Sequence, residues 1–315
     1  MINKRDFLKW GFIAGGAALI SGGVGEIRRA SSQTGPVCPE PPPAQSPPTT
    51  PFVHALPMPP VLHEMPLAQL DPPPVPGNHQ RYGEYPPVHY YEIRVREAFH
   101  SFHPELPPTK VWGYNGIYPG PTIMGRYGEP LLIRIHNELP PDHVGFGIPQ
   151  IITHLHNFHT AWESDGNPNI GFVNFGEFRD HHYASYYAGG DEREALGTLW
   201  YHDHRADFTA PNAYRGLAGF ALFFDHKDTG NEQDSNPQAL KLPSGNYDVP
   251  LVFADKTFDA AGQLVFDQFN FDGFLGDKLT VNGAIQPFLK VARRKYRFRL
   301  LDGGPSRFYE FFLSD

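Results

Sequence analysis

The sequence is poor in cysteine. It contains a single one, Cys38, among 315 residues, and because a disulfide needs two sulfur atoms, no intramolecular disulfide is possible. Cys38 lies in the proline-rich stretch between Gly35 and Gly77. It is too far from any histidine motif to be a plausible metal ligand. We expect it to be a solvent-exposed linker thiol.

Basic residues are also too few for one class of partner. The sequence has 26 lysines and arginines against 34 acidic residues, which gives a formal net charge of −8. A nucleic-acid-binding protein needs a basic footprint. Polyanionic partners, nucleic acid among them, are therefore not expected.

No long stretch outside the N-terminus shows the 3.6-residue spacing of apolar residues that is typical of a helix. Aromatic residues are abundant instead: 25 phenylalanines and 15 tyrosines occur in many short runs bounded by glycine and proline. Such runs favour an all-β sandwich over helices. The length suggests two domains, and 40% apolar residues are enough for a substantial core.

Residues 1–33 have the pattern of an export signal. Lys4 and Arg5 precede an apolar run from Trp10 to Val24, which is too short to span a bilayer comfortably. The Lys-Arg-x-Phe-Leu-Lys pattern resembles a twin-arginine signal with lysine in place of the first arginine. A Sec signal or an uncleaved anchor stays open. We expect an exported protein, periplasmic or extracellular, without a stable membrane span.

The rest of the sequence divides by composition. Sixteen prolines between Gly35 and Gly77 predict an extended strap or linker over residues 34–80. Residues 81–228 contain seven strand-like segments, which suit one Greek-key sandwich: Val88–Arg96, Lys110–Tyr114, Pro130–Asn137, Gln150–His156, His181–Tyr187, Thr198–His202 and Gly219–Phe224. Residues 229–246 read as a linker. Residues 247–315 begin a second unit that is shorter than the roughly 100 residues such a sandwich needs, so we expect unpaired sheet edges and one part of a larger or split protein.

Two histidine pairs carry the functional prediction, His154-Leu155-His156 and His202-Asp203-His204. Alternate side chains of a β-strand project from the same face, so each pair can aim two imidazoles at one point. Spacing alone is weak evidence, since sixteen histidines produce about one His-x-His by chance. The context is stronger, because strand-like residues 151–153 and 197–201 precede the pairs. We predict four neutral nitrogen donors around a metal or metal cluster.

Further residues extend these motifs. Ser164-Asp165-Gly166 follows the first pair, Leu199-Trp200-Tyr201 precedes the second, and Gly216-Leu217-Ala218-Gly219 follows it. Together they resemble the first two copper motifs of the multicopper oxidases, in the branch of spore-coat laccase, bilirubin oxidase and phenoxazinone synthase. Residues 106–123 and 280–309 are similar to the openings of that family's first and second cupredoxin domains. The resemblance implies an all-β fold of cupredoxin-like Greek-key β-sandwiches, one complete domain plus the start of a second.

The resemblance also implies an activity, a laccase-like oxidation of phenolic or similar small-molecule donors coupled to reduction of O2 to water. In that family a type-1 copper collects electrons and a trinuclear copper cluster delivers them to O2. By motif position His154 would bind the type-2 copper, and His156, His202 and His204 the type-3 pair. Asp165 matches an acidic residue that assists proton delivery there. A purely turn-forming Asp-Gly is an equally open role.

Part of the family's copper machinery has no counterpart in this sequence. The remaining cluster histidines and the type-1 ligands belong to His-Pro-x-His-x-His and His-Cys-His motifs, whereas here no histidine follows His226 and no cysteine follows Cys38. We expect these residues to be inactive alone and to need C-terminal cupredoxin domains in cis or in trans. The alternatives are a non-catalytic exported cupredoxin scaffold, like the copper-free cell-division proteins, and the remnant of a truncated gene.

The other histidines are weaker candidates. His159 would face away from His156 in a continuing strand, which favours a loop or a supporting position. His181 and His182 diverge if they lie in a strand, which predicts surface or packing roles. His100 and His103 are expected only to line a loop.

Overall fold

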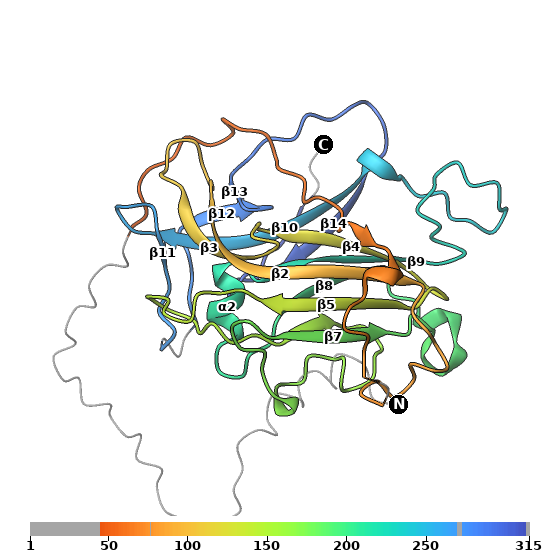
Figure 1. Ribbon diagram of the computed structural model, residues 1–315. Coiled ribbons are helices and arrows are strands. Elements are labelled where there is room, and N and C mark those ends of the chain that lie inside the picture. Colours follow the sequence, from red (N-terminus) through yellow and green to blue (C-terminus); the bar gives the residue numbers. More distant parts are fainter. Residues whose placement is uncertain (1–44, 76, 270–272, 313–315) are drawn as a thin grey trace, which may run out of the picture. The chain divides into compact units, whose positions relative to one another are not determined.

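Strands dominate the molecule, as the aromatic and apolar runs predict (Figure 1). The computed structural model describes residues 45–75, 77–269 and 273–312. Cys38 and the export signal predicted over residues 1–33 lie outside the described residues. None of the described helices is long and apolar enough to cross a bilayer.

The proline-rich segment, residues 45–75 and 77–80, is here called the strap. It is mostly extended, with a short strand β1 (Glu64–Met65) and a 3-10 turn η1 (Leu67–Gln69). Proline has no backbone N–H, so the backbone of the strap forms hydrogen bonds largely through its carbonyl oxygens, which accept from other parts of the chain. Arg134 donates to the carbonyls of Asp71 and Pro72 at 2.8 and 2.6 Å. The strap is thereby fixed to the outer face of the first sheet.

The first sheet has the strand order β1-β2-β5-β7, with β3 paired to β2. Its long strands are β2 (His89–His100), β3 (Thr109–Tyr114), β5 (Leu131–Asn137) and β7 (Phe178–Tyr183). The second sheet has the order β4-β9-β8-β6, formed by β4 (Gly120–Arg126), β9 (Ala218–Phe224), β8 (Thr198–Asp203) and β6 (Thr153–His156). The pairs β2–β5 and β4–β9 are parallel, and β6–β8 is antiparallel.

The two sheets pack face to face over one apolar core. Buried side chains from the first sheet, such as Ile93 and Ile133, meet Leu155, Leu199 and Phe223 from the second. Alternation along each strand supplies these residues, because every second side chain points to the same face. The arrangement is a β-sandwich, with β6 at one edge of the second sheet.

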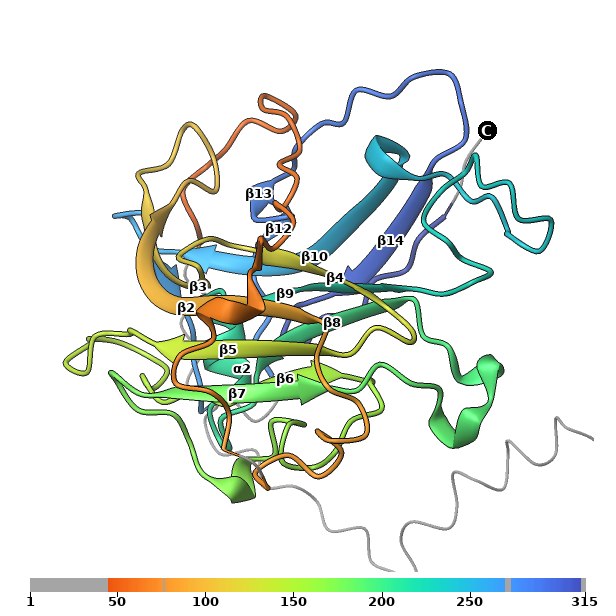
Figure 2. The same cartoon turned by 45° about the vertical axis from the view of Figure 1, so that its right-hand side comes forward.

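A third sheet continues the fold beyond the sandwich. It has the order β11-β10-β12-β13, with β14 parallel to β10, and its strands are β10 (Asp248–Phe258), β11 (Leu264–Val265), β12 (Lys278–Val281), β13 (Ala284–Ile285) and β14 (Arg297–Asp302). Val252 of β10 and Leu301 of β14 pack on Phe220, Leu222 and Phe224 of β9. Figure 2 shows β10 and β14 above β9. Connections contain α2 (Thr209–Arg215) and the 3-10 turns η2 (Pro168–Ile170), η3 (Ala188–Gly190), η4 (Glu192–Glu194) and η5 (Gly245–Tyr247).

Three elements differ from the sequence prediction. β7 is Phe178–Tyr183 rather than His181–Tyr187, because the chain turns at Ser185, whose φ is +52°. β4 was not predicted, since two glycines interrupt its pattern; a Cβ at Gly120 would lie 2.7 Å from the Tyr201 hydroxyl, so the sheet needs glycine there. The short helix α2 was not predicted either.

Candidate metal centre

Three of the four predicted ligands lie on two neighbouring strands, and the fourth comes directly after one of them. β6 and β8 are antiparallel, and the register places His154 directly opposite His202 and His156 opposite Trp200. His204 follows β8 by one residue. Because side chains alternate, His154, His156 and His202 project from the same face of this sheet. The edge position of β6 leaves that face accessible beside the strand.

Three of the four imidazoles can share a metal ion. His154, His156 and His202 each offer a ring nitrogen, and these atoms all lie within 4.8 Å of one another. Nδ1 of His156 is 3.2 Å from Nε2 of His202. Two nitrogens that bind one ion at about 2.0 Å fit that separation. The fold thus brings His154 and His156 next to His202, which is 46 to 48 positions away in the chain.

His204 lies next to this group without joining it. Its ring centroid is 5.2 Å from that of His154 and 5.7 Å from that of His202. Its backbone N–H donates to the Ile152 carbonyl at 2.7 Å, which ties the chain after β8 to the entrance of β6. Its Nδ1 is buried and has no hydrogen-bond partner among the described residues. A buried ring nitrogen without a partner suits a metal ligand.

Hydrogen bonds orient two of the rings. Nδ1 of His154 donates to the backbone carbonyl of Asp165, and Nδ1 of His202 donates to the carbonyl of Asp203 at 2.7 Å. A neutral imidazole carries one proton, so these bonds leave Nε2 of both rings as the free electron-pair donor. Such carbonyl acceptors are the usual outer support of metal-binding histidines.

The environment keeps most of these rings neutral. Burial lowers the pKa of His202 to about 3, against the opposing effect of its bond to the Asp203 carbonyl. Burial and the neighbouring His154 lower the pKa values of His156 and His204. Burial acts in the same direction on His154, but hydrogen bonds to Asp165 outweigh it and raise its pKa. Metal binding requires the neutral form.

Asp165 lies beside a predicted ligand and also in a tight turn. Its half-exposed carboxylate lies 3.4 Å from Nδ1 of His154. It also precedes Gly166 in a tight turn, where φ is +77° and a Cβ at Gly166 would lie 2.3 Å from the Thr153 carbonyl. Glycine is therefore required after Asp165. The turn delivers the Asp165 carbonyl and carboxylate to the same ring.

Three residues that support the histidines were not predicted as site residues: Trp200, Asp203 and Asn212. The indole of Trp200 stacks on His202 and His156 at centroid distances of 4.2 and 5.2 Å. The buried carboxylate of Asp203 accepts from the Ile152 N–H and from Nδ2 of Asn212, both at 2.8 Å. Burial raises the pKa of Asp203 to about 7, although these donors lower it. The position of Trp200 could have been predicted, since it lies two residues before His202 in the same strand. The position of Asn212 could not, because it reaches Asp203 only through the fold of α2.

The metal-facing side chains open into a pocket of about 370 Å³. Its walls come from β6, β8, α2 and the turn after β14, and they include His156, Trp200, His202, His204, Tyr214 and Gly303–Pro305. The pocket gives the histidine nitrogens a space that a metal ion and a small molecule can enter.

The remaining histidines lie outside this group. His159 is in a loop, 3.9 Å from a Glu194 oxygen, which agrees with its predicted position. His181 and His182 are buried around Ser164, which supports the packing role and not the surface role. His103 lies in a loop, as predicted, and its ring is fully buried and bonds to the Thr50 carbonyl of the strap at 2.9 Å. The loop position expected for His100 is wrong, because His100 is the last residue of β2 and its Nε2 lies 2.7 Å from the Gly283 carbonyl oxygen.

Comparisons with known proteins point the same way. A family profile described as multicopper oxidase matches residues 100–228. The chain is 34% identical over 254 residues to a laccase of Bacillus subtilis, and the aligned part covers 72% of this chain and 47% of the relative. It is 34% identical over 231 residues to the bilirubin oxidase of Albifimbria verrucaria, covering 72% and 36%.

A solved structure has the same fold. The laccase of Pediococcus acidilactici superposes with a TM-score of 0.62 at 25% identity, over 82% of this chain and 47% of that one. The chain therefore spans about half the length, or less, of these relatives. The matches confirm the predicted all-β, cupredoxin-like fold. The chain belongs to the multicopper oxidase family.

Proposed function

We propose that this chain supplies the β6–β8 half of the trinuclear copper site of a laccase-like oxidase. The observation that carries the proposal is the convergence of ring nitrogens from His154, His156 and His202 within 4.8 Å of one another. We assign His154 to a type-2 copper, and His156, His202 and His204 to a type-3 pair. Neutral imidazoles suit copper in this role.

The donor set fits copper. Two rings are oriented by carbonyl acceptors, and His204 holds a buried nitrogen without a partner among the described residues. Bound copper would supply one-electron redox chemistry for reducing O2 to water with electrons from phenolic or similar donors. Burial favours the neutral form of His156, His202 and His204. Trp200 restrains two of the rings by stacking.

We assign proton handling to Asp165. Its carboxylate is half exposed, so it can exchange protons with solvent, and it lies 3.4 Å from Nδ1 of His154. The carboxylate would pass a proton between solvent and the copper site at His154. Substitution of Asp165 by asparagine keeps the turn and removes this exchange, so the assembled oxidase should lose rate and keep its copper.

The oxidase reaction needs ligands that this sequence does not contain, since no histidine follows His226 and no cysteine follows Cys38. We propose that these 315 residues oxidise no donor alone and become active with cupredoxin domains that supply the His-Pro-x-His-x-His and His-Cys-His motifs. The chain alone should show no intense thiolate–copper absorption. An intense blue band from the isolated chain would contradict this part of the proposal.

Copper binding is the direct test. Equilibrium dialysis of the full chain against Cu(II), with metal analysis, should show copper bound to the native chain. His156→Ala should weaken binding at least about tenfold, as expected for loss of a direct ligand. His226→Ala is the matched control, because His226 is partly exposed and faces Glu192. Equal copper binding by both variants would exclude the assigned site.

The main alternative function is a non-catalytic exported cupredoxin scaffold. Such a scaffold has no need of converging histidines, so their geometry favours the copper site. The same dialysis separates the two, because a scaffold should bind no copper at these positions.

We also propose export, with residues 1–33 acting as a twin-arginine-like signal. Fusion of these residues to a reporter that functions only outside the cytoplasm tests this. Substitution of Lys4 and Arg5 together should abolish transport if the twin-arginine route is used, whereas a Sec signal should tolerate it when other positive charges are added nearby.

A further inference from the structure

One turn joins the edges of the two sheets of the sandwich. It comprises residues 162–166 and is here called the bridging turn. On one side Gly166 lies against β6, the end strand of the second sheet, since a Cβ there would be 2.7 Å from Cα of His154. On the other side Ser164 lies against β7, the end strand of the first sheet, where the backbone N–H of His182 donates to the Ser164 hydroxyl at 3.0 Å. The bridging turn therefore couples the strand of a copper ligand to a strand that carries no assigned ligand.

Ser164 is fully buried, and each of its polar atoms has a partner. Its N–H donates to the Ala161 carbonyl at 2.9 Å, and its carbonyl accepts from Nδ1 of His181 at 3.0 Å. Its hydroxyl oxygen lies 3.3 Å from Nδ1 of His79 in the strap. Since that oxygen already accepts from the N–H of His182, its own hydrogen can be donated to His79. Three histidines outside the copper-ligand group thus surround one serine.

These three histidines keep fixed hydrogen-bonding roles because burial favours their neutral form. Burial lowers the pKa of His181 to about 4, against the opposing effect of its bond to the Ser164 carbonyl. Burial also lowers the pKa values of His79 and His182. A neutral imidazole has one donor nitrogen and one acceptor nitrogen. His181 therefore donates from Nδ1 to Ser164, and His182 donates from Nε2 to the Tyr85 carbonyl at 2.7 Å.

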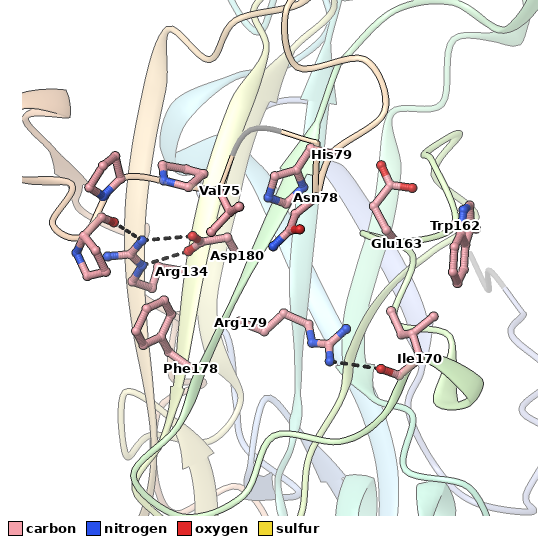
Figure 3. A pocket seen from close by; sticks show the side chains of 13 residues that line it. Val75, Asn78, His79, Arg134, Trp162, Glu163, Ile170, Phe178, Arg179 and Asp180 are labelled. Carbon is pink, nitrogen blue, oxygen red and sulfur yellow. Dashed lines mark hydrogen bonds and ion pairs between the residues drawn. The ribbon is translucent and has the colours of Figure 1, made fainter.

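The strap holds the bridging turn from a second direction. The backbone N–H of Gln80 donates to the Glu163 carboxylate at 2.8 Å, next to the contact between His79 and the serine hydroxyl. Figure 3 shows His79 of the strap and Glu163 of the turn on the same side of the pocket between the strap and β7, with Arg179 of β7 below them. The turn is therefore held both by β7 and by the strap.

The position of this turn decides which ring nitrogen of His154 is free. Nδ1 of His154 donates to the carbonyl of Asp165, and the hydrogen bond of one ring nitrogen determines the protonation of the other. If the carbonyl moved away, the ring could carry its proton on Nε2, the nitrogen assigned to the metal. Asp165 directly follows Ser164, so the contacts of Ser164 fix the place of this carbonyl.

We propose that Ser164 is a positioning residue for the copper ligand His154. It holds the Asp165 carbonyl against Nδ1 of His154 and thereby keeps Nε2 free for the metal, while β7 and the strap hold Ser164 itself. This inference rests on the copper site proposed above. The protonation of the His154 ring is nevertheless a property of the metal-free chain, so it can be measured without copper.

The first experiment finds the protonated nitrogen of His154 in the metal-free full chain. NMR of the chain with isotope-labelled histidine nitrogens distinguishes protonated from bare ring nitrogens, at a pH at which the ring is neutral, and His154→Gln identifies the signal by its loss. In the native chain Nδ1 should carry the proton. Ser164→Ala should give a mixture of both tautomers, and Ser185→Ala should keep the native one. Ser185 is the matched control, since it is also fully buried but its hydroxyl donates to the Tyr183 carbonyl.

The second experiment measures Cu(II) affinity by equilibrium dialysis. Ser164→Ala should bind copper about tenfold more weakly than the native chain, as expected for loss of a group that supports a ligand, and Ser185→Ala should bind like the native chain. His181→Phe keeps an aromatic ring and removes the donor to the Ser164 carbonyl, so it should change both measurements in the same direction. If circular dichroism shows that Ser164→Ala does not fold, His181→Phe decides.

The outcomes separate this inference from the copper assignment. The inference is overturned if Nε2 of His154 carries the proton in the native chain, or if the folded variants of Ser164 and His181 keep the native tautomer. Equal losses of copper affinity in Ser164→Ala and Ser185→Ala would also overturn it. If the native chain binds no copper, the copper assignment fails, and a tautomer that changes in Ser164→Ala but not in Ser185→Ala still supports the positioning of the ring.

Discussion

β9 contains only apolar residues, whereas β14 mixes charged and apolar residues, and the surroundings of the two strands are opposite. All residues of β9 are buried, because Phe223 faces the sandwich core and Phe220 faces the third sheet. In β14 Phe298 is 46% exposed, whereas Arg299 beside it is buried. The comparison shows that an apolar side chain in a strand is not buried merely because it is apolar. What packs against each face decides which side chains are covered.

The largest expected effect comes from making the same substitution in both strands. Phe223→Ala removes a ring that packs on Phe158 at a centroid distance of 4.4 Å, and the free energy of unfolding should fall by about 3 to 5 kcal/mol. Phe298→Ala should cost less than about 1 kcal/mol, because half of that ring already contacts water. Urea unfolding followed by circular dichroism measures both. Equal losses would show that the outer face of β14 is covered in solution.

The buried charge in β14 gives the next largest effect. Arg299 pairs with Asp248 through bonds of 2.7 and 2.6 Å and also donates to the Gly197 carbonyl. Asp248→Asn should destabilise by roughly 3 kcal/mol, since the buried guanidinium loses the carboxylate that it bonds twice and keeps only Asp228 at 4.0 Å. The double variant Arg299→Leu with Asp248→Leu should recover much of this loss. A double variant no more stable than Asp248→Asn would contradict the electrostatic explanation.

The pH dependence of stability should report on Lys256, a fully buried lysine of β10 in the third sheet. It is fully buried, donates to the Tyr214 carbonyl at 2.5 Å, and burial lowers its pKa to about 7, although Asp255 raises it. Above this pH the folded chain has released a proton that the unfolded chain keeps, so stability rises with pH. Between about pH 7 and 9 the native chain should gain roughly 2 to 3 kcal/mol relative to Lys256→Met. An identical pH dependence in both would show that Lys256 stays charged.

Much of the fold and site was predictable because local pattern and packing agree. Residues 219–224 form a run that is apolar on both faces, and β9 is covered on both faces. The two His-x-His pairs lie on neighbouring strands, as alternation predicts for ligands that must converge. Neither conclusion required distant contacts.

The rest depended on contacts that the sequence does not show. β4 contains glycines that normally weaken a strand, and only the approach of the Tyr201 hydroxyl explains Gly120. In β14 the outward position of Phe298 and Leu300 could not be recognised without knowing that Arg299 meets Asp248 on the covered side. The position of the strap depends on bonds from Arg134 to the carbonyls of Asp71 and Pro72, which no local pattern specifies.

The smallest effect on stability, and one that also changes the copper site, is expected at Asn212. This α2 residue donates to the Asp203 carboxylate at 2.8 Å and also accepts from the Ile148 N–H at 3.0 Å, so it joins the helix to β8 and to the loop that precedes β6. Asn212→Ala should cost about 1 to 3 kcal/mol, because it leaves buried polar groups without partners. Cu(II) affinity should fall about tenfold, since His202 and His204 flank Asp203. A matched loss of stability without any change in copper affinity would limit Asn212 to a structural role.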